Sequence, residues 1–176
     1  TWVKKWPDNI EGLEALADHY WNHDMFNKAI TEYEKILTID PNEYRVYDYI
    51  SDIYKDLDNY EKAIKYKKKY MNAAASSLDG CISVAYLFQQ IGEFDSAKVY
   101  YQQAEIIDPM ALEPKRYLLH MKTIMQDYDE QIETEYIRLF RYAKSRSDSI
   151  RIVESLFGTL YFIEGKISKM RLLRDS

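Results

Sequence analysis

Apolar and small residues return along this chain at a fixed interval of 34 positions. One aromatic series falls at Tyr20, Tyr54 and Phe88. A second aromatic series and a series of alanines keep the same interval, at Phe26, Tyr60 and Phe94 and at Ala29, Ala63 and Ala97. A fixed period of this length is typical of repeat proteins, in which one supersecondary unit stacks on the next. The pattern therefore predicts an array of similar units.

Each unit is expected to be two helices joined by a tight turn. In the first unit, apolar positions follow helical spacing on both sides of a break at Asp24, and the second helix ends before Pro41. We expect an all-α, right-handed solenoid of about four to five antiparallel helix pairs, forming one domain over residues 10–176. The expected units are residues 10–43, 44–77, 78–111, 112–150 and 151–176.

The two ends of the array depart from the strict interval. Phe157 and Gly158 resemble a fifth helix pair that begins near Arg151, which implies an extension of about five residues, placed in the polar stretch 144–149. Pro7 lies 34 residues before Pro41. Residues 1–9 are therefore expected to be the remnant of a preceding unit or an N-terminal extension, and we expect the natural protein to continue toward its N-terminus.

Composition narrows the functional class. The chain is 47% hydrophobic and 30% charged, which is compatible with a folded core, and its net charge is −5. The part from Arg138 onward carries +5 and the remainder −10, an asymmetry that bears on partners. Cys81 is the only cysteine, which excludes an internal disulfide and fits a cytoplasmic protein. No apolar run has the length of a membrane span, so no membrane insertion is expected.

The repeated residues resemble the tetratricopeptide repeat, whose pattern is W-x2-L-G-x2-Y, then A-x3-F, then P. The first unit reads Leu13-x2-Leu16-Ala17-x2-Tyr20, Ala29-x3-Tyr33, Pro41. The third reads Cys81-x2-Val84-Ala85-x2-Phe88, Ala97-x3-Tyr101, Pro109, whereas the second has Lys67 and Ala75 at its later positions. Independently of the resemblance, small residues at Ala17, Ser51 and Ala85 and at Ala29, Ala63 and Ala97 would let helices approach closely.

The resemblance implies a concave groove lined by the first helix of each unit, and a function in protein–protein interaction as a scaffold or adaptor without catalysis. Charge focused in such a groove favours an oppositely charged partner, here a basic or basic–aromatic peptide or helix. We expect charge reversal at Asp48 and Asp52 to weaken binding of that partner. The groove residues implied are Glu11, Glu14, Asp18, Trp21, Asn22, Arg45, Asp48, Asp52, Asp56, Asp79, Tyr86 and Gln90.

One well-known subset of the family clamps the acidic C-terminal tail of heat-shock chaperones with basic residues. The matching positions here are Glu14, Asp18, Tyr49, Asp79 and Ser83, of which three are acidic. An acidic tail would be repelled, so this partner is rejected. Two other classes remain open: a regulatory or sensory domain of a larger enzyme, and a nucleic-acid-associated protein that uses the basic C-terminal part. Self-association through the end units also remains open.

Other candidate chemistry is weak. His19 and His23 have a spacing that can share a metal, but no third ligand is evident, so we expect no metal site and no cofactor. Cys81 is expected to be a buried, inert thiol. The lysine run 65–69 is expected on the outer face as a solvated surface, which makes nucleic acid the less favoured partner.

Overall fold

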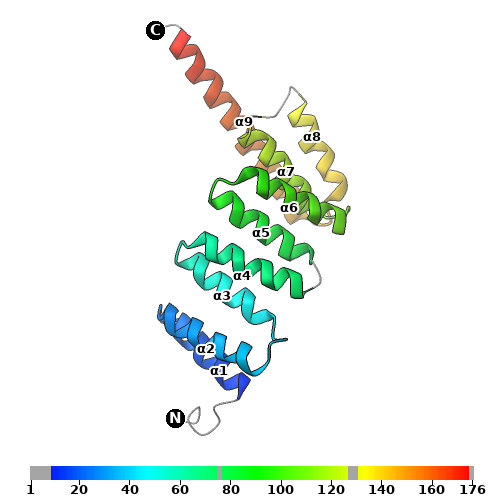
Figure 1. Cartoon of the computed structure of the whole chain (residues 1–176). Coiled ribbons are helices and arrows are strands. Elements are labelled where there is room, and N and C mark those ends of the chain that lie inside the picture. Colours follow the sequence, from blue (N-terminus) through cyan, green and yellow to red (C-terminus); the bar gives the residue numbers. More distant parts are fainter. Residues whose placement is uncertain (1–8, 75–76, 127–130, 175–176) are drawn as a thin grey trace. The chain divides into compact units, whose positions relative to one another are not determined.

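The computed structural model describes residues 9–74, 77–126 and 131–174, with side chains up to residue 165 (Figure 1). All regular structure in these residues is helical, so the predicted all-α fold class is confirmed. The helices are α1 (Ile10–Trp21), α2 (Phe26–Ile39), α3 (Arg45–Asp56), α4 (Tyr60–Ala73), α5 (Leu78–Gln90), α6 (Phe94–Ile107), α7 (Leu112–Ile124), α8 (Ile132–Arg138), the 3-10 helix η2 (Leu139–Tyr142) and α9 (Arg146–Arg174).

The chain divides into two compact units, which we call the N-unit (Thr1–Glu93) and the C-unit (Phe94–Ser176). In the N-unit, α1 packs on α2 and α3 packs on α4, which in turn contacts α5. In the C-unit, α7 packs against α6, α8 and α9. The sequence also suggests that Trp2 and Trp6 could pack on the first helix pair, but both lie outside the described residues.

The 34-residue interval reappears in the backbone at the turns. Asp24, Asp58, Gly92 and Gln126 have positive φ angles of 56°, 53°, 78° and 60°. Each donates its backbone N–H to the carbonyl three residues earlier, over 2.9 to 3.2 Å. The left-handed conformation ends one helix and lets the chain reverse into the next. The break predicted at Asp24 is confirmed, Asp58 and Gly92 repeat it at the same interval, and Gln126 extends the series into the less regular fourth unit.

Glycine at position 126 is expected to stabilise the protein. The left-handed conformation costs an L-residue about 1–2 kcal/mol, and glycine avoids this cost. Part of that gain is offset because glycine has a larger conformational entropy in the unfolded chain. Gln126→Gly should therefore raise the free energy of unfolding by about 0.5–1 kcal/mol, as measured by urea denaturation. Gln126→Ala is the control and should give no gain. A lower stability for the glycine variant would contradict the role assigned to this turn.

Small residues sit where helices meet, as predicted. The six that the sequence singles out have no exposed surface: Ala17, Ser51, Ala85, Ala29, Ala63 and Ala97. Ser51 fits among alanines because its hydroxyl donates to the backbone carbonyl of Ala63 at 2.9 Å. Around them, Leu13, Tyr33, Ile36 and Ile50 form the core shared by α1, α2 and α3. Close approach of helices thus leaves room only for small side chains at these points.

The end of the chain differs from expectation. A helix pair was expected over residues 151–176, but α9 is one continuous helix from Arg146 to Arg174. Its start is fixed by a reciprocal cap, in which the Asp148 N–H donates to Ser145 Oγ (3.1 Å) and the Lys144 N–H to Asp148 Oδ2 (2.8 Å). The extension of about five residues that we expected before this helix was wrong, because Arg146 follows Leu112 by 34 residues. Glycine within the helix costs about 1 kcal/mol but does not end it.

Candidate functional site

The twelve predicted groove residues all lie in the N-unit. Four are on α1 and a fifth, Asn22, is its C-cap; four are on α3 and three on α5. A hydrogen bond joins side chains of α1 and α3, because Trp21 Nε1 donates to Asp56 Oδ2 at 2.9 Å. That bond joins the last turns of two helices that are 35 residues apart in sequence. The structure therefore brings part of the predicted set together on neighbouring helices.

The carboxylate of Asp18 is held by a core tyrosine. Tyr33, which is fully buried on α2, donates its hydroxyl hydrogen to Asp18 Oδ1. Burial and the nearby carboxylate raise the pKa of Tyr33 well above its usual range. Tyr49 on α3 lies 5.3 Å from the Tyr33 ring, and its pKa is raised by burial and by Glu14. Both tyrosines are therefore neutral donors that leave the acids their negative charge.

A buried lysine holds the two central acids. Lys67 Nζ on α4 forms an ion pair with Asp48 and lies 3.7 Å from Asp52, and only 8% of the Lys67 side chain is exposed. Lys55 adds a second ion pair to Asp52 at 3.0 Å. The expectation that Lys67 lies on the outer face was wrong. Its long apolar stem is buried, and its ammonium group reaches the acids of α3.

Lys67 and Tyr33 perform the same task in successive repeats. They lie 34 residues apart, and the acids that they hold, Asp18 and Asp52, are also 34 residues apart. Sequence reasoning missed this link. The signal was a lysine in the aromatic position of a repeat that carries acids on its first helix.

Four acids of α1 and α3 in the predicted set pair with no cation among the described side chains: Glu11, Glu14, Asp18 and Asp56. We call them the acidic face. Asp18 and Asp56 accept hydrogen bonds from neutral donors, and Glu14 lies beside the Tyr49 hydroxyl. Arg45, the cation near Glu14, has its guanidinium 3.0 Å from Glu43. The acidic face thus keeps a concentration of negative charge, whereas Asp48 and Asp52 are neutralised within the fold.

The predicted residues of α5 are less closely connected to the acidic face. Asp79, Tyr86 and Gln90 are all exposed on this helix. Tyr86 is close enough to affect the pKa of Lys55, and Asp79 that of Tyr70. These two residues of α5 are therefore near side chains of α3 and α4. That the α5 residues line one groove with α1 stays a prediction.

The lysine run of α4 packs on aromatic rings. Lys62 Nζ lies 4.9 Å from the centre of the Tyr54 ring, Lys68 4.7 Å from Phe88 and Lys69 5.0 Å from Tyr66. Lys67 is buried, and the other three lysines each contact a different aromatic ring, so their ammonium groups do not form one continuous row. Nucleic-acid binding needs several cations that are free to contact successive phosphates, so this geometry disfavours it.

The other candidate residues resolve into packing roles. Cys81 is buried as predicted, which raises the pKa of its thiol. The His19 and His23 rings lie 4.2 Å apart between their centres and are tilted by 43° to each other. Over the described residues, no three His, Cys, Asp or Glu side chains form a cluster suited to a metal ion. No helix within that same part of the chain combines the length and apolar character of a membrane span.

His120 on α7 gives the C-unit a predicted pH dependence. Burial and the neighbouring Arg116 guanidinium lower its pKa, so the unfolded chain binds a proton there more readily than the folded chain. Stability should therefore be greatest above the ordinary histidine pKa of about 6.5 and fall as the pH is lowered through and below it. His120→Asn should lose less unfolding free energy between pH 8 and pH 5 than the wild type. A pH dependence unchanged in His120→Asn would contradict the assignment.

A sequence model of the family described as "Tetratricopeptide repeat" matches this chain three times in succession, over residues 10–43, 44–77 and 78–109. No curated protein matches the chain. The matched ranges contain every residue of the acidic face. The family match therefore includes the surface described above.

Solved structures share the fold at low sequence identity. "MamA 41-end from Desulfovibrio magneticus RS-1" is 15% identical, with a TM-score of 0.66 over 82% of this chain and 81% of that chain. "Crystal structure of MamA" is 17% identical, with a TM-score of 0.59 over 86% and 96%. "First TPR of Spaghetti (RPAP3) bound to HSP90 peptide SRMEEVD" is 15% identical, with a TM-score of 0.56 over 66% and 93%. With three consecutive matches that cover more than half of its length, the chain belongs to the tetratricopeptide repeat family.

Proposed function

We propose that this chain is a protein-interaction module that binds a basic or basic–aromatic segment of a partner protein on its acidic face. The observation that carries the proposal concerns the described side chains. Among them, Glu11, Glu14, Asp18 and Asp56 have neutral hydrogen-bond donors or no donor, while nearby Asp48 and Asp52 are paired with lysines. Uncompensated charge on one surface attracts an oppositely charged ligand and speeds its association.

The family supports peptide binding as the general activity. The RPAP3 structure, which shares this fold, is described as bound to an HSP90 peptide, SRMEEVD. That peptide carries three acids, which the acidic face would repel. We therefore propose the same kind of ligand, an extended segment, with the opposite charge. Trp21 and Tyr49 border the face and supply ring surface for aromatic or arginine side chains.

The proposal is tested with the fluorescent peptide Ac-Lys-Tyr-Lys-Arg-Phe-Lys-amide, whose binding is followed by anisotropy. Glu11→Lys with Glu14→Lys should weaken binding at least tenfold, because two attractive charges become repulsive. The matched control, Glu61→Lys with Glu93→Lys, makes the same charge change at two exposed sites away from the face. Equal weakening in both variants would show non-specific attraction to an acidic chain and would refute the proposal.

A further inference from the structure

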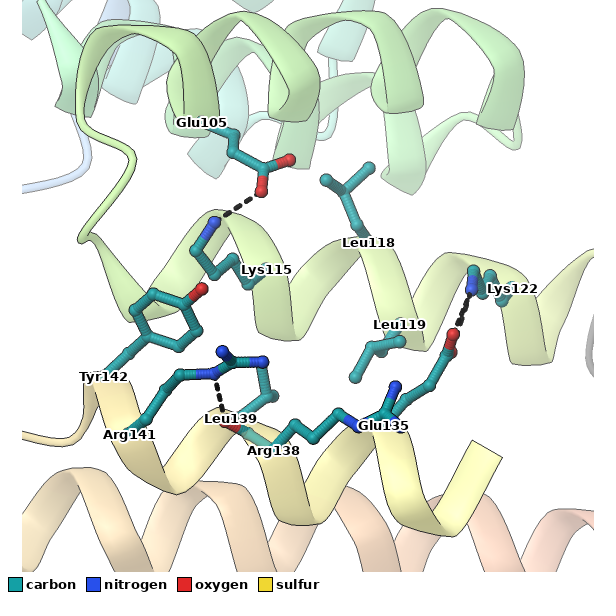
Figure 2. A pocket seen from close by; sticks show the side chains of 10 residues that line it. All are labelled: Glu105, Lys115, Leu118, Leu119, Lys122, Glu135, Arg138, Leu139, Arg141 and Tyr142. Atoms are coloured by element: carbon teal, nitrogen blue, oxygen red, sulfur yellow. Dashed lines mark hydrogen bonds and ion pairs between the residues drawn. The ribbon is translucent and has the colours of Figure 1, made fainter. Parts of the chain in front are cut away.

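The C-unit contains a pocket of opposite charge. It has a volume of about 320 Å³ and lies where α7 faces α6 on one side and α8 with η2 on the other (Figure 2). Its lining includes four cations and two acids, and leucines supply an apolar wall. We call it the basic pocket. The lining residues used below are Lys115, Lys122, Arg138, Arg141, Tyr142 and Leu118.

Two of the four cations are neutralised in place. Lys115 forms an ion pair with Glu105, and Lys122 forms one with Glu135 at 2.8 Å. Figure 2 shows these two pairs on opposite sides of the pocket, with Leu118 between them. The pairs fix the rim, and they leave the net positive charge of the pocket to its two arginines.

Arg138 and Arg141 have no carboxylate partner among the described residues. Arg141 Nε donates to the backbone carbonyl of Arg138 at 3.2 Å, which orients the guanidinium and leaves its terminal nitrogens without a hydrogen-bond partner in the part of the chain that the structure describes. The same guanidinium lies 5.4 Å from the centre of the Tyr142 ring. Guanidinium groups held in this way match the geometry of a carboxylate.

The basic pocket shares no residue with the acidic face and lies away from the α9 side of α7. Glu113 on α7 pairs with Arg151 of α9 at 2.9 Å, and Arg116 donates to Ser155 at 3.0 Å, so that side of the helix is covered. Residues 115, 118 and 122 follow helical spacing on another side of α7, which is the side that lines the pocket. The pocket is therefore a distinct surface with its own charge.

We propose that the basic pocket binds an acidic segment of a partner protein, with a Glu or Asp carboxylate on Arg138 and Arg141 and a neighbouring apolar side chain against Leu118. The volume is at the lower end of the range for ligand sites, about 300–1,000 Å³, which suits one or two side chains. An apolar wall beside a pair of free guanidiniums matches a mixed acidic–apolar peptide. A nucleic-acid strand would need a longer row of free cations.

The probe is the fluorescent peptide Ac-Glu-Leu-Glu-Leu-Glu-amide, titrated with the whole chain and followed by anisotropy. Arg138→Gln with Arg141→Gln should weaken binding at least tenfold. The control, Lys144→Gln with Arg146→Gln, removes the same charge at exposed positions outside the pocket and should change affinity less than twofold. Leu118→Ser should weaken binding of this peptide by several-fold. Circular dichroism confirms that all variants fold.

Several outcomes would overturn the proposal. These are no binding of the wild type, equal loss in the arginine variant and its control, or equally tight binding of Ac-Gln-Leu-Gln-Leu-Gln-amide. Displacement of the peptide by a short oligonucleotide at lower concentration than by unlabelled peptide would assign the pocket to nucleic acid instead. A dimer in light scattering that Arg138→Gln with Arg141→Gln abolishes would assign it to a second copy of this chain.

Discussion

Replacing Asp48 and Asp52 by lysine is expected to lower the free energy of unfolding by about 3–5 kcal/mol. Removing one partner of a buried ion pair leaves the other as an uncompensated charge in a medium that solvates it poorly. Here both carboxylates that hold the Lys67 ammonium are lost, and two further positive charges are placed against it. Urea denaturation followed by circular dichroism at 222 nm measures the loss.

A third substitution separates this cause from a general effect of charge. Adding Lys67→Met keeps the apolar stem and removes the buried ammonium, so it should recover a large part of the lost stability. In the wild-type background Lys67→Met should lower stability by less than the double reversal, because the acids that lose the ammonium, Asp48 and Asp52, are each about one-third exposed to water. No recovery in the triple variant would contradict the role given to Lys67. These carboxylates are consequently poor probes of ligand binding, since their reversal would weaken the fold itself.

Tyr33→Ala is expected to cost about 3–5 kcal/mol. Its ring is fully buried between α1, α2 and α3, and truncating an aromatic core residue to alanine leaves a cavity that a packed interior fills only in part. The substitution also removes packing between the first and second repeats, including the contact between the Tyr33 and Tyr49 rings. Urea denaturation at pH 7 gives the difference.

Tyr33→Phe is the matched control because it keeps the ring and removes only the hydroxyl that donates to Asp18. Asp18 is exposed and can accept from water instead, so the expected cost is about 1 kcal/mol. A loss for Tyr33→Phe as large as that for Tyr33→Ala would show that the hydrogen bond, and not packing, dominates at this position.

The repeated features of the fold could be predicted because each one reflects a local rule. Alanine at positions 29 and 63 marks a close helix contact, and Asp24, Asp58 and Gly92 mark the turns at the same interval. Both signals depend on side-chain size or backbone conformation, which a sequence displays directly. The left-handed turn at Gln126 was harder to find, because glutamine has no preference for that conformation.

The parts that could not be predicted depend on contacts between residues far apart in sequence. Lys67 was predicted on the outer face because lysine is usually solvated. The acids that pair with its ammonium group lie 19 and 15 residues away in sequence, on another helix. The continuous α9 was missed because Phe157 and Gly158 resemble part of a fifth helix pair. The basic pocket combines three helices and η2 of the C-unit, and no local motif in the sequence displays such a combination.

The acidic face is tested most directly by mapping where the peptide Ac-Lys-Tyr-Lys-Arg-Phe-Lys-amide binds the 15N-labelled protein. We expect the amide resonances nearest Glu11, Glu14, Asp18 and Asp56 to shift in a saturable way, and those of the C-unit to stay in place. Saturable shifts confined to the C-unit, or no shift at any residue at low ionic strength, would contradict the proposal that this face is the docking surface.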